Sequence, residues 1–187
     1  MKEEISTGAI WNKAGISGAA LGLMSTTFMF ITQYTGTSIT GFWALTISTA
    51  LWTAKFAGDI WLMMFFMKKL CTEYYKVTGA ETFKFGMATA LLSALIYSGA
   101  YLANVTFISP EIVDETFNTV LQSSAGMLDS NSLSMIEKMR ENFPQTAFFS
   151  NFIYCFLYGT VLSSILSRTI PSRNPFADYE SKSTDNQ

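Results

Sequence analysis

The fold is decided by residues 42–67, FWALTISTALWTAKFAGDIWLMMFFM, a largely apolar run that carries Lys55 and Asp59 in its interior. A helix needs about 20 apolar residues to cross a hydrocarbon core of about 30 Å, and this run is longer. It therefore predicts a membrane-spanning helix that is tilted or that protrudes. Each charge at mid-depth costs about 2.5–3.5 kcal/mol, so two charges one helical turn apart need a structural or functional reason.

The composition favours a membrane protein. Of the 187 residues, 49% are hydrophobic and only 14% are charged, whereas about a quarter of a soluble domain is charged. We expect a single polytopic membrane domain over residues 1–171 and a disordered cytoplasmic tail at 172–187, which is polar and poor in apolar side chains. The chain has no basic stripe that could neutralise phosphates, which argues against nucleic-acid binding.

The residue types argue against an enzyme. The chain has no histidine, which removes the Ser-His-Asp arrangement and the usual zinc and haem ligand sets. Cys71 and Cys155 lie far apart in the sequence and form no CxxC pair, so we interpret both as free buried thiols. We predict no catalytic residue, no metal ligand and no cofactor.

Three further apolar runs complete a predicted all-α, four-helix membrane bundle. The four spans are expected at 14–34, 42–67, 85–108 and 147–170, with an extracytoplasmic helical loop at 109–144. Small residues spaced by four mark two helix-packing seams: Ala14, Gly18 and Gly22 in the first span, and Gly86, Ala90 and Ala94 in the third. Such seams let helix backbones approach closely.

The connection between the third and fourth spans predicts an amphipathic helical hairpin. Ser109 followed by Pro110 is a helix-start pattern, because serine caps and proline suits the first helical position. A second short helix is predicted from the capping box formed by Ser134 and Glu137, and Pro144 is expected to end it. Both helices are too polar to span, so we expect them on the membrane surface or folded over the spans.

The distribution of basic residues predicts the orientation. The loop between the third and fourth spans holds only two basic residues beside six acidic ones. Nine basic residues fall on the other side of the four-span arrangement: Lys2, Lys13, Lys68, Lys69, Lys76, Lys84, Arg168, Arg173 and Lys182. Positive charge stays in the cytoplasm, so both termini are predicted there.

The charged pair suggests a polar cluster inside the bundle. Lys55 and Asp59 share a helix face, but the order Lys-then-Asp is the weaker one for pairing, so a third partner is expected. Placing the spans at equal depth gives the candidate cluster: Lys55, Asp59, Tyr97, Tyr154, Tyr158 and Ser163. Two interpretations stay open, because the cluster could hold the helices in register or could form part of an ion or substrate path.

Several short motifs together resemble a known family. They are Gly18 and Gly22 in the first span, Lys68-Lys69 after the second, Thr82-Phe83-Lys84-Phe85-Gly86, Ile108-Ser109-Pro110-Glu111, and Gly159, Ile165 and Arg168 in the fourth. With these the chain resembles the bacterial inner-membrane family, of Bacteroidota type, catalogued as domain of unknown function number forty-one ninety-nine. The resemblance implies no catalytic residue. It implies a membrane-associated glycosyltransferase as one candidate partner.

Two functions follow as hypotheses. The first is a non-enzymatic scaffold or accessory subunit of an envelope membrane complex, favoured by the packing seams and the external hairpin. The second is a small transporter or channel subunit that uses Lys55 and Asp59. The partners expected are the lipid bilayer and either a second copy of the chain or another membrane protein.

Overall fold

The computed structural model describes residues 6–38, 42–74, 77–124 and 129–170. The predicted tail at 172–187 lies outside these residues. Within the described ranges the chain is helical, with no strand. The elements are α1 (Thr7–Ser38), α2 (Phe42–Glu73), α3 (Gly79–Ala103), the π-helix η1 (Asn104–Ile108), α4 (Glu111–Ser123) and α5 (Ser130–Thr169).

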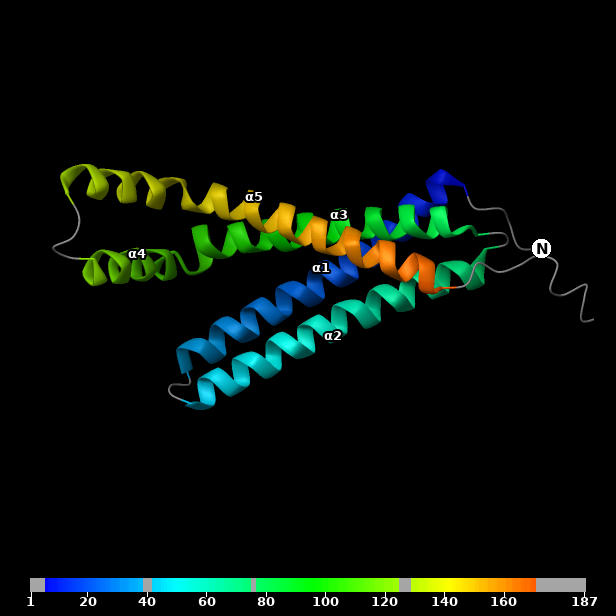
Figure 1. Cartoon of the computed structure of the whole chain (residues 1–187), viewed down its shortest axis with the longest axis horizontal. Coiled ribbons are helices and arrows are strands. Elements are labelled where there is room, and N and C mark those ends of the chain that lie inside the picture. Colours follow the sequence, from blue (N-terminus) through cyan, green and yellow to red (C-terminus); the bar gives the residue numbers. More distant parts are fainter. Residues whose placement is uncertain (1–5, 39–41, 75–76, 125–128, 171–187) are drawn as a thin grey trace, which may run out of the picture.

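The long helices form two antiparallel pairs, α1 with α2 and α3 with α5, and α3 also packs against α1. In Figure 1, α3 runs between α1 and α5, and α2 lies along α1. The starts of α1 and α3 and the ends of α2 and α5 gather at one end of the bundle, on the right in Figure 1. Toward the opposite end, α2 and α5 separate, and α4 lies beside the first part of α5.

Small residues set the distance between α1 and α3, as the spacing predicts. A Cβ atom added to Gly18 would lie 2.8 Å from Cβ of Leu92, and one added to Gly22 would lie 2.8 Å from Cβ of Ile96. These separations are shorter than the 3.5–4.0 Å or so of an ordinary carbon contact. The backbone of α1 at Gly18 and Gly22 therefore contacts side chains of α3 directly, and only glycine fits at these two positions.

The second predicted seam packs α3 against α5. A Cβ atom on Gly159 of α5 would lie 2.5 Å from Cβ of Ala90, and one on Gly86 would collide with the side chain of Ser163. Ser163 is fully buried and donates a hydrogen bond to the carbonyl oxygen of Phe83 (3.1 Å). Close packing on both faces explains why α3 is the central helix of the bundle.

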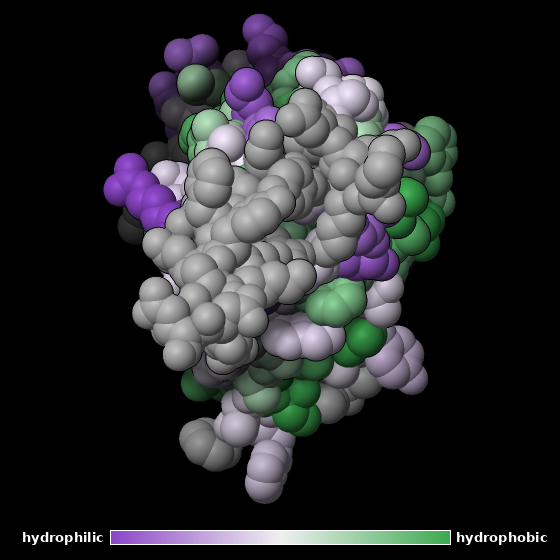
Figure 2. Space-filling view, turned by 90° about the vertical axis from the view of Figure 1, so that its right-hand side faces the viewer, coloured by the Kyte–Doolittle hydropathy of each residue, from purple (hydrophilic) through white to green (hydrophobic). Residues whose placement is uncertain are grey.

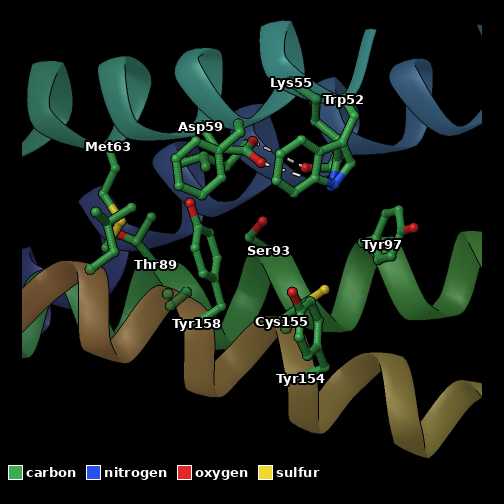
Figure 3. Close-up of a pocket in the computed structure, with 17 residues that line it drawn as sticks. Trp52, Lys55, Asp59, Met63, Thr89, Ser93, Tyr97, Tyr154, Cys155 and Tyr158 are labelled. Atoms are coloured by element: carbon green, nitrogen blue, oxygen red, sulfur yellow. Dashed lines mark hydrogen bonds and ion pairs between the residues drawn. The ribbon is translucent and has the colours of Figure 1, made fainter. Parts of the chain in front are cut away.

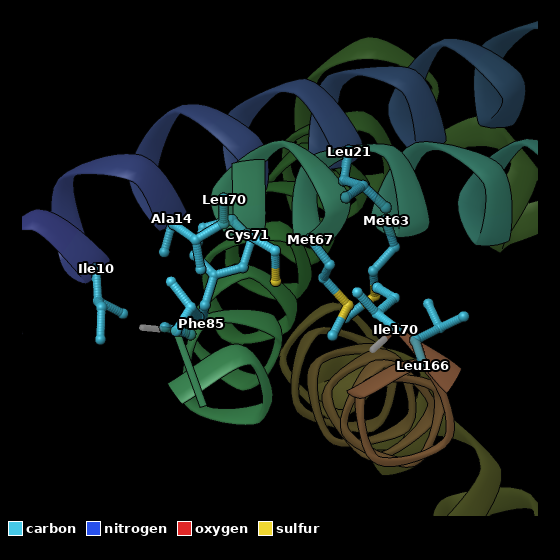
Figure 4. Packing of buried hydrophobic residues seen from close by; sticks show 12 residues of the cluster. Ile10, Ala14, Leu21, Met63, Met67, Leu70, Cys71, Phe85, Leu166 and Ile170 are labelled. Carbon is cyan, nitrogen blue, oxygen red and sulfur yellow. The ribbon is translucent and has the colours of Figure 1, made fainter. Parts of the chain in front are cut away.

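The hydrophobic core lies where the four long helices meet. Figure 4 shows Met63, Met67 and Leu70 of α2 between side chains of α1, α3 and α5. Met67 and Phe85 are at most 1% exposed. Flexible methionines suit this meeting point, because they fill irregular gaps between helices that cross at different angles.

The outer faces of the helices are apolar, as expected for a helical bundle in a membrane. On α5 the exposed stripe follows a spacing of four: Phe149, Ile153, Leu157, Val161 and Ile165. Figure 2 shows hydrophobic side chains (green) at the surface of the bundle among hydrophilic ones (purple). Exposed apolar area of this extent in a water-soluble domain would drive association.

Three helical segments are long and apolar enough to cross a membrane: Thr7–Gly36, Gly79–Ile108 and Asn131–Thr169. Among the described helices, α2 is not one of them. Lys55 and Asp59 lie in the middle of α2 and lower the hydropathy of the stretches that contain them, so length and composition support three of the four predicted spans.

The start of α3 is capped by residues that the sequence interpretation left unused. The hydroxyl of Thr78 accepts from the backbone N–H of Glu81 (3.2 Å), and the Glu81 carboxylate accepts from the backbone N–H of Thr78 (2.8 Å). This capping box begins α3 at Gly79, about two turns before the predicted span.

The predicted cap at Ser109 is wrong. The end of α3 widens into the π-helix η1, in which the backbone N–H of Ser109 donates to the carbonyl oxygen of Asn104 (2.8 Å). Pro110 takes the cap position of α4, which has no side-chain cap bond, and the hydroxyl of Ser109 accepts from Nε2 of Gln33 (3.0 Å). The interhelical bond uses the hydroxyl that the local pattern assigned to a cap.

The predicted end of a helix at Pro144 is also wrong. Helix α5 is continuous over 40 residues with Pro144 inside it, and it is capped by Asp129, whose carboxylate accepts from the backbone N–H of Ser132 (2.8 Å). The capping box at Ser134 is therefore not formed at a helix start. Proline removes one backbone bond, but packing of α5 against α4 before it and against α3 after it keeps the helix continuous.

Candidate functional site

A cavity of about 140 Å³ lies between the four long helices and is lined by residues of α1, α2, α3 and α5. Five of the six predicted cluster residues line it: Lys55, Asp59, Tyr97, Tyr154 and Tyr158. The sixth, Ser163, does not, because its hydroxyl turns to the backbone of α3. Ser163 therefore lies on a side of the α5 axis that the sequence did not predict.

Lys55 and Asp59 form an ion pair across one turn of α2. The ammonium Nζ lies 3.9 Å from Oδ2 of Asp59, which is beyond hydrogen-bond length. The side chain of Lys55 is 30% exposed and that of Asp59 is 11% exposed. The pairing predicted from the spacing is thus present, but it is loose.

Each member of the pair has a second partner on another helix. Ser25 of α1 donates a hydrogen bond to Oδ1 of Asp59 (3.2 Å). The Lys55 ammonium lies 5.2 Å from the ring centroid of Tyr97 on α3, within cation–π range. The expected third partner of the pair is therefore Ser25 for the carboxylate and Tyr97 for the ammonium.

Aromatic rings form much of the wall. Trp52 and Phe56 stack along α2 with centroids 5.7 Å apart, and Phe56 meets Tyr158 of α5 at 5.8 Å. Figure 3 shows Tyr158 rising from α5 with its hydroxyl end toward α2. These rings bring α2 and α5 together at the cavity with few polar contacts between the two helices.

Two buried hydroxyls of the wall have no hydrogen-bond partner among the described residues. They are Oγ1 of Thr89, a residue that is 1% exposed, and Oη of Tyr158. A buried hydroxyl without a partner costs about 1–3 kcal/mol. Unpaired hydroxyls therefore line the same cavity as an ion pair that is not hydrogen-bonded.

A second polar cluster, which the sequence interpretation missed, joins α1 to η1. Nδ2 of Asn104 donates to Oε1 of Gln33 (2.7 Å), and Nε2 of Gln33 donates to Ser109. Asn104 is 3% exposed. No pattern in the sequence predicts the π-helical turn that carries Asn104, so this cluster could not be predicted.

At the end of the bundle where α1 begins, α1 and α2 are joined by an ion pair. Nζ of Lys13 donates to Oε2 of Glu73 (2.6 Å), and Lys69 lies 3.9 Å from the same carboxylate. The hydrogen bond from Lys13 lowers the pKa of Glu73 below its ordinary value. This pair anchors the end of α2 to the start of α1.

The cavity offers charge and hydrogen bonding but no arrangement typical of a metal centre. Within the described ranges, no group of three or more His, Cys, Asp or Glu side chains is placed to hold a metal ion. Cys155 lines the cavity and Cys71 is buried elsewhere, and both are free thiols. The chemistry available is pairing of charges and donation from hydroxyls.

Comparisons with known proteins place the chain in a family. Searches of the curated proteins and of the solved structures gave no match. The family described as "Protein of unknown function (DUF4199)" matches residues 13–169, which include α1 from Lys13 onward and α5 to its last residue. The resemblance noted in the sequence is therefore confirmed, and the chain belongs to this family.

Proposed function

We propose that this chain is a four-span scaffold or accessory subunit of a complex in a bacterial inner membrane. Helices α1, α3 and α5 supply three spans. We assign α2 as the fourth because it is as long as α1 and runs back along it (Figure 1). Its Lys55 is paired with Asp59, which lowers the free-energy cost of placing both charges in hydrocarbon.

The observation that carries the scaffold role is the helical hairpin made by α4 and the first part of α5. It projects past the ends of α1 and α2 (Figure 1). Two contacts hold it together: the rings of Phe117 and Phe143 lie 5.7 Å apart, and Nε of Arg140 donates to Asp114 (3.0 Å). A braced element of this kind presents a fixed surface to a partner.

The surface of this hairpin has apolar side chains that the chain itself does not cover. Met135 is 66% exposed and Met139 is 57% exposed, one turn apart on α5. Adaptable methionine side chains are common at protein-binding surfaces. They support a contact with another membrane protein, for which a membrane-associated glycosyltransferase is one candidate.

The test is affinity purification of the full chain from its native membrane in a gentle detergent, followed by mass spectrometry and native sizing. We expect a second protein in stoichiometric amount. The double variant Met135→Ser with Met139→Ser should lose it, whereas the control Glu141→Gln, at an exposed position of the same helix, should keep it. A homo-oligomer with no second protein would contradict the scaffold role.

The cavity favours a second candidate, a small transporter or channel subunit. Ionisable side chains inside the membrane are typical of ion and substrate paths. Four spans leave little room for a private path, so transport would require several copies. A pure homo-oligomer whose reconstituted flux disappears in Asp59→Asn would support transport over the scaffold role.

A further inference from the structure

We propose that the cavity lined by Lys55 and Asp59 is a binding site for one small zwitterion of the amino-acid class, such as glycine or alanine. A scaffold needs no such ligand, so this inference goes beyond the proposed function. The ligand class follows from the charge, the hydrogen-bonding capacity and the volume of the cavity.

The charges of the cavity favour a ligand with both signs. Lys55 and Asp59 face the same space. A simple cation is attracted by the carboxylate but repelled by the ammonium, and a simple anion is attracted by the ammonium but repelled by the carboxylate. The two charged groups are 3.9 Å apart and not hydrogen-bonded to one another. Each therefore has capacity left for a group of opposite charge on a ligand.

The hydrogen-bonding groups of the cavity are those that a zwitterion uses. Thr89 and Tyr158 carry hydroxyls without a described partner, and Figure 3 shows them on the Met63 and Asp59 side of the cavity, where they can accept hydrogen bonds from a ligand ammonium, whereas the Lys55 ammonium supplies the donor for a carboxylate. Oδ2 of Asp59 supplies an acceptor for an ammonium group, because the Ser25 bond uses only Oδ1.

The volume of the cavity suits a ligand of a few heavy atoms. The cavity measures about 140 Å³, close to an engineered cavity of about 150 Å³ that admits a benzene molecule. Glycine and alanine fit within this volume. Trp52 and Phe56 form part of one wall.

The test is equilibrium dialysis of radiolabelled glycine against the purified full chain in lipid nanodiscs. We expect saturable binding of one glycine per chain, displaced by unlabelled alanine but not by acetate or methylammonium. Absence of saturable glycine binding would overturn the proposal. So would equal displacement by acetate or by methylammonium, because the cavity would then recognise one charge only.

Variants locate the binding. Thr89→Val and Tyr158→Phe each remove one hydroxyl and should lower the affinity about three- to tenfold. Ser98→Ala is the matched control, since Ser98 also carries a buried hydroxyl without a described partner on α3 but does not line the cavity. Its affinity should be unchanged. Equal affinity in both hydroxyl variants and the control would refute the assignment.

A charge-free cavity provides an independent check. Lys55→Met combined with Asp59→Leu removes both charges together, so no lone buried charge remains to unfold the bundle. Far-UV circular dichroism should show the helical content retained, and glycine binding should fall below detection. Retained binding in this folded variant would place the ligand elsewhere and overturn the proposal.

Discussion

Replacing Gly22 by alanine should destabilise the bundle, because the new Cβ has no room. It would lie 2.8 Å from Cβ and 2.9 Å from Cγ2 of Ile96, and 3.2 Å from the carbonyl oxygen of Ser93. Carbon atoms in ordinary contact are about 3.5–4.0 Å apart, so α1 and α3 must separate locally by about 1 Å. Overpacking of this kind costs about 1–3 kcal/mol.

The gain in helix propensity from glycine to alanine, about 1 kcal/mol, offsets part of that cost. The matched controls are Gly15→Ala and Gly99→Ala, where nothing lies within 4 Å of the added Cβ. These controls gain the propensity without the collision, so they should be stabilised by about 0.5–1 kcal/mol. The expected difference between Gly22→Ala and either control is therefore about 1–3 kcal/mol.

The assay is unfolding of the purified chain in mixed micelles, followed by far-UV circular dichroism as the denaturing detergent is increased. Gly18→Ala should behave like Gly22→Ala, because its Cβ would lie 3.0 Å from the backbone oxygen of Thr89. The double variant should cost less than the sum, since one separation of the helices relieves both collisions. If Gly22→Ala is as stable as Gly15→Ala, the close seam between α1 and α3 is refuted.

Three further outcomes are expected from the same unfolding assay. Lys55→Met or Asp59→Leu alone should lower the free energy of unfolding by about 3 kcal/mol, because each leaves one buried charge unpaired. The double variant should lower it clearly less, and strictly additive losses would show that the two side chains do not interact. The lowered pKa of Glu73 means that its pairing with Lys13 stabilises the fold above the unfolded pKa of about 4.3 and is lost as pH falls through the folded value. Lys13→Met should therefore reduce the loss of stability on acidification, by at most about 1 kcal/mol because the pair is a third exposed; an unchanged acid profile would contradict this. Pro144→Ala should stabilise the continuous helix by about 1–3 kcal/mol, whereas a loss would indicate that the proline has a structural role of its own.

Much of the helical architecture follows from the sequence because apolar runs and small-residue spacing act locally. The seams at Gly22 and Gly86 were predicted from their period of four, and the structure places both at helix contacts. Pro144 misled the prediction because a local rule about proline was overridden by packing on both sides of it. The early start of α3 at Gly79 was missed because the capping box at Thr78 was not recognised.

The candidate site was predicted in part, because the sequence does not show how each helix is rotated about its own axis relative to its neighbours. Lys55 and Asp59 share a helix, so their spacing alone predicts that they meet. Depth alone placed Tyr158 correctly beside them and Ser163 incorrectly. Ser25 was missed because the direction in which a side chain of another helix points depends on how the helices pack.

Single-cysteine accessibility tests the four-span membrane arrangement most directly. In a background without Cys71 and Cys155, cysteines at Gly36, Ala80 and Asn131 report on the far end of α1, the start of α3 and the hairpin. In intact cells, a membrane-impermeant maleimide should label the cysteines at Gly36 and Asn131, and should reach the one at Ala80 only after permeabilisation. Labelling of Ala80→Cys from outside, like that of Gly36→Cys, would show that α2 does not span the membrane and would contradict the proposed arrangement.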